Sequence, residues 1–131
     1  MKQSPDQKEI RAANVPVAGP YSQAVEAGDY VFVSGQLPLD PATGMVVPGG
    51  IREQTEMLFT NLANVLAAGG LGLGSVVRTE VFLKDIKDFT VFNEVYASKF
   101  VFPVKPARFV IQAADLPKGV AVEVSCIAFR R

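Results

Sequence analysis

Two charged residues, Arg108 and Glu123, stand out because each interrupts a segment that otherwise has the apolar composition of a β-strand. Arg108 lies in Pro106–Val110, and Glu123 lies in Val120–Val124, a short loop further along the chain. An isolated charge is costly to bury in apolar surroundings, so these two matter more than charges that solvent can reach. Together they could provide an arginine that binds a small acid and a carboxylate that binds a water molecule.

The chain contains no histidine. Histidine is the side chain that titrates near neutral pH, the usual general base and the commonest metal ligand. Any chemistry must therefore use carboxylate, arginine, hydroxyl groups, the backbone and water, and we expect neither a metal nor a cofactor. Cys126 is the only cysteine, so no disulfide can form within the chain. We interpret Cys126 as a small buried core residue.

The size and charge of the chain restrict its class. Its 131 residues suffice for one domain, which we expect to span residues 1–131. With 13 basic and 13 acidic side chains the formal net charge is zero, so no basic excess points to nucleic acid. The N-terminus has no apolar signal segment, and no run is long enough to span a bilayer. With a single thiol, these features favour a cytoplasmic protein without a membrane partner.

Helical and strand-like periodicities both occur in the chain. Helical spacing is clearest in residues 51–68, and a second helix is expected at about 89–101, before Pro103. A hairpin is expected around Gly28-Asp29, which separates two strand-prone runs. The expected strands are Glu9–Arg11, Tyr21–Ala27, Tyr30–Ser34, Ser75–Ile86, Ala107–Ala113 and Val120–Phe129. This order predicts an α+β fold with both helices packed on one face of a largely β sheet.

Alternation along the last two strands predicts which side chains share a face. Arg108, Val110 and Gln112 alternate with Phe109 and Ile111, as Glu123 alternates with its valine neighbours. If the helices cover Phe109 and Ile111, then Arg108 and Glu123 both point away from them. The strand expected at 75–86 would likewise place Val77, Thr79, Val81 and Leu83 on one side. The face away from the helices would still carry Val110, Ile127 and Phe129, so we expect another subunit to cover it.

Seven short motifs are spread along nearly the whole chain. They are Gly19–Ala24, Val33–Pro38, Thr79–Asp85, Phe92–Tyr96, Pro106–Arg108, Leu116-Pro117 and Val122–Val124. In their order and spacing these motifs resemble those of the Rid (YjgF-type) family and are close to the RidA enamine/imine deaminases. A single motif would be weak, but the set is strong.

This resemblance implies a fold, an assembly and an activity. The implied fold is similar to chorismate mutase of the bacillus type, with a mixed sheet, and the implied assembly is a homotrimer with a central β-barrel and ligand pockets between subunits. Family members hydrolyse reactive enamines and imines, such as 2-aminoacrylate, to 2-oxo acids and ammonia. By motif, Arg108 would anchor the substrate carboxylate and Glu123 would hold the water. The implied pocket lining is Tyr21, Ser34 and Asn93, with backbone from Gly35 and Val110.

Two neighbouring positions depart from the family pattern. Many members carry cysteine or threonine two residues after the arginine, where this chain has Val110, and Phe109 replaces a common serine. No thiol chemistry can be assigned to Val110, although its backbone can still contact a ligand. The segment before Pro106 also looks shorter than in many relatives, which affects the expected size of the pocket.

Simpler interpretations remain open for the same residues. Arg108 and Glu123 could form a structural ion pair across neighbouring strands. Tyr21 could be a packed ring, Asn93 a helix-surface amide, and Ser34 a hydrogen-bonding residue at a strand end. As a whole, the protein could bind or sense 2-oxo acids and small carboxylates without turnover. A ribonuclease role is disfavoured, because a neutral chain without histidine lacks a phosphate-binding surface and the usual acid–base pair.

Overall fold

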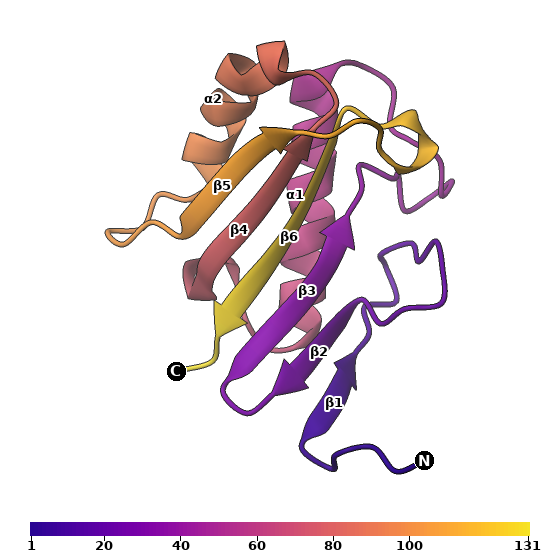
Figure 1. Cartoon of the computed structure of the whole chain (residues 1–131), viewed down its shortest axis with the longest axis vertical. Coiled ribbons are helices and arrows are strands. Elements are labelled where there is room, and N and C mark those ends of the chain that lie inside the picture. Colours follow the sequence, from indigo (N-terminus) through magenta and orange to yellow (C-terminus); the bar gives the residue numbers. More distant parts are fainter.

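The computed structural model describes residues 1–131 and contains a mixed sheet with two helices on one of its faces (Figure 1). The helices are α1 (Ile51–Ala68) and α2 (Phe89–Lys99), so α2 ends two residues earlier than expected. Neighbouring strands are antiparallel except β4 and β5, which are parallel. In order across the sheet, the strands are β1 (Gln7–Ile10), β2 (Ala24–Ala27), β3 (Tyr30–Gln36), β6 (Val122–Phe129), β4 (Val76–Leu83) and β5 (Ala107–Gln112). The α+β prediction is confirmed.

Local sequence signals account for the elements that were predicted best. The β2–β3 hairpin turns at Gly28, whose φ of +60° lies in the left-handed region that glycine adopts without strain. Helix α1 begins where the Gly50 amide donates to the Glu53 carboxylate at 2.8 Å, and it ends before Gly70, which also has a positive φ. No helix of the structure combines the length and the apolar character needed to cross a membrane.

The main core lies between the sheet and the helices. Helix α1 buries Leu58, Leu62, Val65 and Leu66 against the sheet, as its periodicity predicted. Cys126 belongs to the same cluster with 2% of its surface exposed, and burial is the main cause that raises the pKa of its thiol to about 12. The interpretation of this cysteine as a core residue is confirmed.

The faces of β5 are opposite to the prediction. Register partners on neighbouring strands share a face, and Arg108 pairs with Thr79 of β4, which is fully buried under the helices. Arg108 therefore lies on the helix side of the sheet. Phe109 pairs with Glu80 on the other side, and Ile111, on the same side as Phe109, is 48% exposed. The prediction that the helices cover Phe109 and Ile111 is wrong, because alternation separates two faces without saying which one meets the helices.

The central strand β6 follows its prediction. Val122 and Val124 are fully buried under the helices, and Glu123 lies on the opposite face. The register partner of Glu123 on β4 is Phe82, which is also on the face away from the helices. Arg108 and Glu123 thus lie on opposite faces of one sheet.

A β-bulge near the start of β4 shifts its first residues. The register between β4 and β6 changes between Val76 and Arg78. As a result Val76 is buried and Val77 is 44% exposed, the reverse of the expected alternation, whereas Thr79, Val81 and Leu83 face the core as predicted.

The face of the sheet away from the helices carries many exposed apolar side chains beside a few charged ones, which include Glu80 and Glu123. Two aromatic contacts cross it, between Tyr30 and Phe129 and between Phe82 and Phe109, with ring centroids 5.2 and 5.7 Å apart. Tyr30 and Phe32 are each nearly half exposed. Val110, expected on this face, instead packs toward the main core. The apolar side chains of this open face are Tyr30, Phe32, Phe82, Phe109, Ile111, Ile127 and Phe129.

Candidate active site

Arg108 is held by side chains of α2 and has no carboxylate partner. Its Nη1 donates to Oδ1 of Asn93 at 2.8 Å. Its guanidinium carbon lies 4.6 Å from the ring centre of Tyr96 and 5.7 Å from that of Phe89. The ion pair with Glu123 considered from the sequence is absent, since β4 lies between the two strands. A positive charge fixed in this way remains available to an anion.

A cavity of about 400 Å³ opens beside this guanidinium, and we call it the Arg108 cavity. No acidic side chain lines it, and Lys105 contributes a second cation whose Nζ donates to the Phe102 carbonyl at 2.7 Å. The lining residues are Asn93, Tyr96, Ala97, Phe100, Lys105, Pro106 and Arg108. With two cations and no acid, its chemistry suits a small carboxylate.

Glu123 lines a second cavity, of about 310 Å³, which we call the Glu123 cavity. The carboxylate is half-buried against the backbone of Gly35, and burial raises the pKa of Glu123 above the ordinary value of a glutamate. A Cβ atom at Gly35 would collide with Oε2 of Glu123. The lining residues are Ala18, Tyr21, Ser34, Gly35, Leu37, Pro117 and Glu123. A carboxyl group in these surroundings can exchange a proton nearer to neutral pH than an exposed one.

A β-bulge in β3 shapes the wall of the Glu123 cavity. Val33 pairs with Cys126 and Gln36 pairs with Val124, so Ser34 and Gly35 together face a single residue of β6. Such a bulge bends the strand and redirects its side chains. The Ser34 hydroxyl donates to the Ser22 carbonyl at 2.6 Å, which ties the bulge to the segment that carries Tyr21.

Gln23 fixes the loop before Tyr21. Its buried amide accepts from the Ala12 amide at 2.6 Å and donates to the carbonyls of Ala12 and Val15. Tyr21 remains 43% exposed, and its hydroxyl accepts from the Ala18 amide at 3.3 Å. The ring of Tyr21 therefore borders open space, while its hydroxyl has a partner within the loop.

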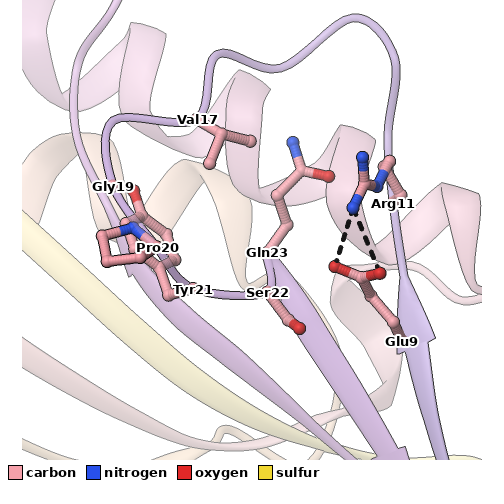
Figure 2. Close-up of a pocket in the computed structure, with 8 residues that line it drawn as sticks. All are labelled: Glu9, Arg11, Val17, Gly19, Pro20, Tyr21, Ser22 and Gln23. Carbon is pink, nitrogen blue, oxygen red and sulfur yellow. Dashed lines mark hydrogen bonds and ion pairs between the residues drawn. The ribbon is translucent and has the colours of Figure 1, made fainter.

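A third cavity, of about 520 Å³, lies on the other side of the same loop (Figure 2). Figure 2 shows its one cation, Arg11, paired with both carboxylate oxygens of Glu9, each at 3.2 Å. Because this pair is internally neutralised, the cavity offers no free charge to a ligand. Its lining residues are Glu9, Arg11, Val17, Gly19, Pro20, Tyr21, Ser22 and Gln23.

Six of the seven residues predicted for the site lie in two separate cavities. Arg108 and Asn93 line the first, Tyr21, Ser34, Gly35 and Glu123 line the second, and Val110 lines neither. Asn93 is more than a helix-surface amide, since it accepts from Arg108. The sequence analysis missed Tyr96, although its helical spacing of three from Asn93 could have placed both on the same side of α2. No group of three or more carboxylate or thiol side chains is placed to share a metal ion.

Comparisons with known proteins bear on this geometry. The family model described as Endoribonuclease L-PSP matches residues 12–130. A 2-iminobutanoate/2-iminopropanoate deaminase from Bos taurus is 45% identical over 92% of this chain and 88% of its own length. The chain belongs to the Rid family.

Solved Rid structures share its fold. RidA from an Antarctic Psychrobacter is 40% identical, and its structure superposes with a TM-score of 0.88. The superposition covers 93% of this chain and 98% of that one. E. coli TdcF with bound serine is 37% identical, and its structure superposes with a TM-score of 0.89. This superposition covers 95% of this chain and 99% of that one. The predicted Rid family and the mixed sheet with two helices on one face are therefore confirmed.

Proposed function

We propose that this Rid protein hydrolyses short 2-imino acids, such as 2-iminopropanoate and 2-iminobutanoate, and the related enamine 2-aminoacrylate, to 2-oxo acids and ammonia. The observation that carries the proposal is Arg108, a guanidinium without a carboxylate partner in a cavity without acids. The name of the bovine relative supports the same reaction. The serine bound to TdcF supports a ligand that carries a carboxylate.

The active site would be shared between subunits of a homotrimer. Arg108 and Glu123 lie on opposite faces of the sheet, so one copy of the chain does not bring them to one small substrate. A second copy packed on the open face could join the Arg108 cavity of one subunit to the Glu123 cavity of the next. The exposed aromatic side chains of that face favour such a partner over solvent.

Within the joined site, Arg108 would bind the substrate carboxylate by two parallel hydrogen bonds, which fix both the position and the plane of the imino acid. Asn93 holds one edge of the guanidinium and leaves other donors free. Tyr21, Ser34 and the backbone of Gly35 would form the opposite wall, and the Val110 backbone would lie near the leaving nitrogen. The hydrophobic lining around Phe100 leaves room for a short apolar side chain.

Glu123 would direct the water. The imine nitrogen takes up a proton from solvent, the water oxygen forms a bond to C2, and a water proton passes to Glu123, which yields a tetrahedral carbinolamine. Glu123 then gives this proton to the amino group, and the C–N bond breaks with its electron pair on nitrogen, so that ammonia leaves. The hydroxyl proton passes to Glu123, and from there to solvent, as the carbonyl of the 2-oxo acid forms. Since these imines already hydrolyse in water, positioning and one proton shuttle are sufficient.

The decisive experiment measures imine decay directly. An amino-acid dehydratase generates the imine in the presence of the purified protein, and the disappearance of the imine is followed against buffer alone. Faster decay with the protein supports the proposal. Decay at the buffer rate overturns it, and calorimetric binding of 2-oxo acids without any acceleration would instead favour a binding or sensing module.

The pH dependence of the reaction follows from the raised pKa of Glu123. The carboxylate must be ionised to accept a proton, so kcat/KM should fall with decreasing pH through a midpoint above the ordinary glutamate pKa. Glu123→Gln should remove this limb together with most of the activity. The measurement is a pH profile of kcat/KM, with spontaneous hydrolysis subtracted at each pH.

A control uses Glu94, an exposed carboxylate on α2 that pairs with Arg52. Glu94→Gln should leave the midpoint of the acidic limb unchanged, and a limb that persists in Glu123→Gln contradicts its assignment to Glu123.

The stability of the fold gives a second measurement of the raised pKa of Glu123. Because burial raises the folded pKa, the contribution of Glu123 to the unfolding free energy is fully present below its unfolded pKa and is lost as pH rises through the folded value. At neutral pH, Glu123→Gln should therefore not lower the unfolding midpoint.

Gly35→Ala should displace the Glu123 carboxylate, because the added Cβ would collide with it. A displacement of the water-holding group by about 1 Å is expected to lower kcat by roughly a hundredfold. The φ angle at Gly35 is not in the left-handed region, so the backbone itself accepts alanine. Steady-state kinetics beside a thermal melt check this, and Gly72→Ala, where no atom lies within 4 Å of the new Cβ, is the matched control. Full activity in Gly35→Ala would contradict the role of Glu123.

A further inference from the structure

A buried pair, Tyr96 and Thr79, lies behind Arg108, and neither residue was among those predicted for the site. The two hydroxyl oxygens are 2.8 Å apart, and the residues are 8% and 0% exposed. Thr79 is also the register partner of Arg108 across the parallel β4–β5 pair. Thr79 therefore lies beside the backbone of Arg108 in the sheet and also contacts the hydroxyl of Tyr96, the residue whose ring packs against the Arg108 side chain.

The Tyr96 ring is packed by other aromatic rings. Phe59 contacts it edge-on with centroids 5.8 Å apart, Phe92 lies at 5.6 Å and Phe100 at 4.6 Å. The hydroxyl–hydroxyl contact with Thr79 holds the far end of the ring. A ring fixed by neighbours and by its hydroxyl is a rigid surface for a guanidinium.

We infer that Tyr96, held by Thr79, is a positioning residue that fixes the plane of the Arg108 guanidinium. The ring supports the guanidinium with its carbon 4.6 Å from the ring centre, while Asn93 binds one nitrogen. These two contacts restrain both the tilt and the rotation of the group. Its remaining donors then point in one plane, which is the requirement for two parallel hydrogen bonds to a carboxylate. The inference rests on the proposed function only in naming that carboxylate as part of an imino acid.

Kinetics and binding test the role of the ring. Tyr96→Leu removes the aromatic face and should raise KM for 2-iminopropanoate, and Kd for pyruvate, by about tenfold, with little change in kcat. Tyr96→Phe keeps the face and should restore most of the affinity. Thr79→Val releases the hydroxyl but keeps the ring, so its Kd for pyruvate should rise by about threefold.

The matched control is Phe59→Leu. Phe59 packs on the same ring from α1 but does not line the Arg108 cavity. The Phe59→Leu variant should lower the melting temperature about as much as Tyr96→Leu does, while leaving Kd for pyruvate within about twofold of the wild-type value. An equal loss of affinity in Phe59→Leu and Tyr96→Leu would mean that only stability is being measured, and would overturn the inference.

A spectroscopic measurement separates this inference from the proposed reaction. The Nε–Hε NMR signal of Arg108, assigned by its loss in Arg108→Lys, should show an ordered group in the resting wild-type protein and in Phe59→Leu. It should show increased mobility in Thr79→Val and in Tyr96→Leu. If Thr79→Val changes neither this signal nor the pyruvate Kd, the inference fails even if Tyr96→Leu does not fold. If the signal responds as expected but imines decay at the buffer rate, the proposed function fails and the positioning role stands.

Discussion

Replacing Arg108 with alanine is expected to lower kcat/KM for 2-iminopropanoate by about 10² to 10⁴-fold. Two charge-assisted hydrogen bonds to the carboxylate are lost, each worth about 1.5–3 kcal/mol. The fold should survive, because Arg108 makes no ion pair and its one hydrogen-bond partner, Asn93, is itself only half-buried. Steady-state kinetics and a thermal melt of the same preparation measure both effects.

Two further variants show whether the loss reflects geometry or charge. Arg108→Lys keeps the charge but cannot form the planar pair, so it should recover only a small part of the activity. Arg52→Ala removes an exposed arginine whose partner is Glu94 and should leave kcat/KM unchanged. Wild-type activity in Arg108→Ala would remove the basis of the proposed function.

Mixing two inactive variants is expected to restore activity. Arg108→Ala and Glu123→Ala each lack one half of every shared site, so neither homotrimer should turn over imines. In a closed ring of three with head-to-tail interfaces, every mixed trimer pairs one intact Arg108 with one intact Glu123 at a single junction. Mixed trimers carrying two affinity tags, refolded together and purified through both, should therefore show about a third of wild-type activity.

The recovered activity distinguishes a shared site from a site within one chain. If Arg108 and Glu123 of the same chain acted together, every site of a mixed trimer would lack one of them and no activity would return. Sedimentation must show that the doubly tagged species is a trimer. A trimer without activity would contradict the shared site, whereas a monomeric wild-type protein would contradict the assembly itself.

Local signals predicted the elements well and the faces of the edge strand poorly. The Gly28 turn and the Ile51–Ala68 helix depend on residues close in sequence, and both were confirmed. The face of Arg108 depends on its pairing with Thr79, almost thirty positions earlier in the chain and in a parallel strand. Alternation contains no such information, so the edge strand was placed the wrong way round while central β6 was placed correctly.

The candidate site shows a similar division. Isolated charges in apolar segments led directly to Arg108 and Glu123, because buried charge is rare without a task or a partner. Tyr96 was overlooked for the opposite reason, since a buried aromatic residue at helical spacing looks like ordinary core. It is core on the side of Phe59 and a support for Arg108 on the other. A residue with two such surfaces becomes recognisable only when both neighbours are located.

The buried position of Cys126 has a consequence for a protein that would handle electrophiles. Its thiol is 2% exposed with a pKa of about 12, so the folded chain presents no accessible thiolate that could add to the C2 carbon of an imine. Water then has no sulfur competitor at the pocket, and a reactive substrate does not consume the protein that removes it. The same thiol can serve as a built-in probe, because a maleimide can label it only when the core opens, which makes the labelling rate a direct record of unfolding.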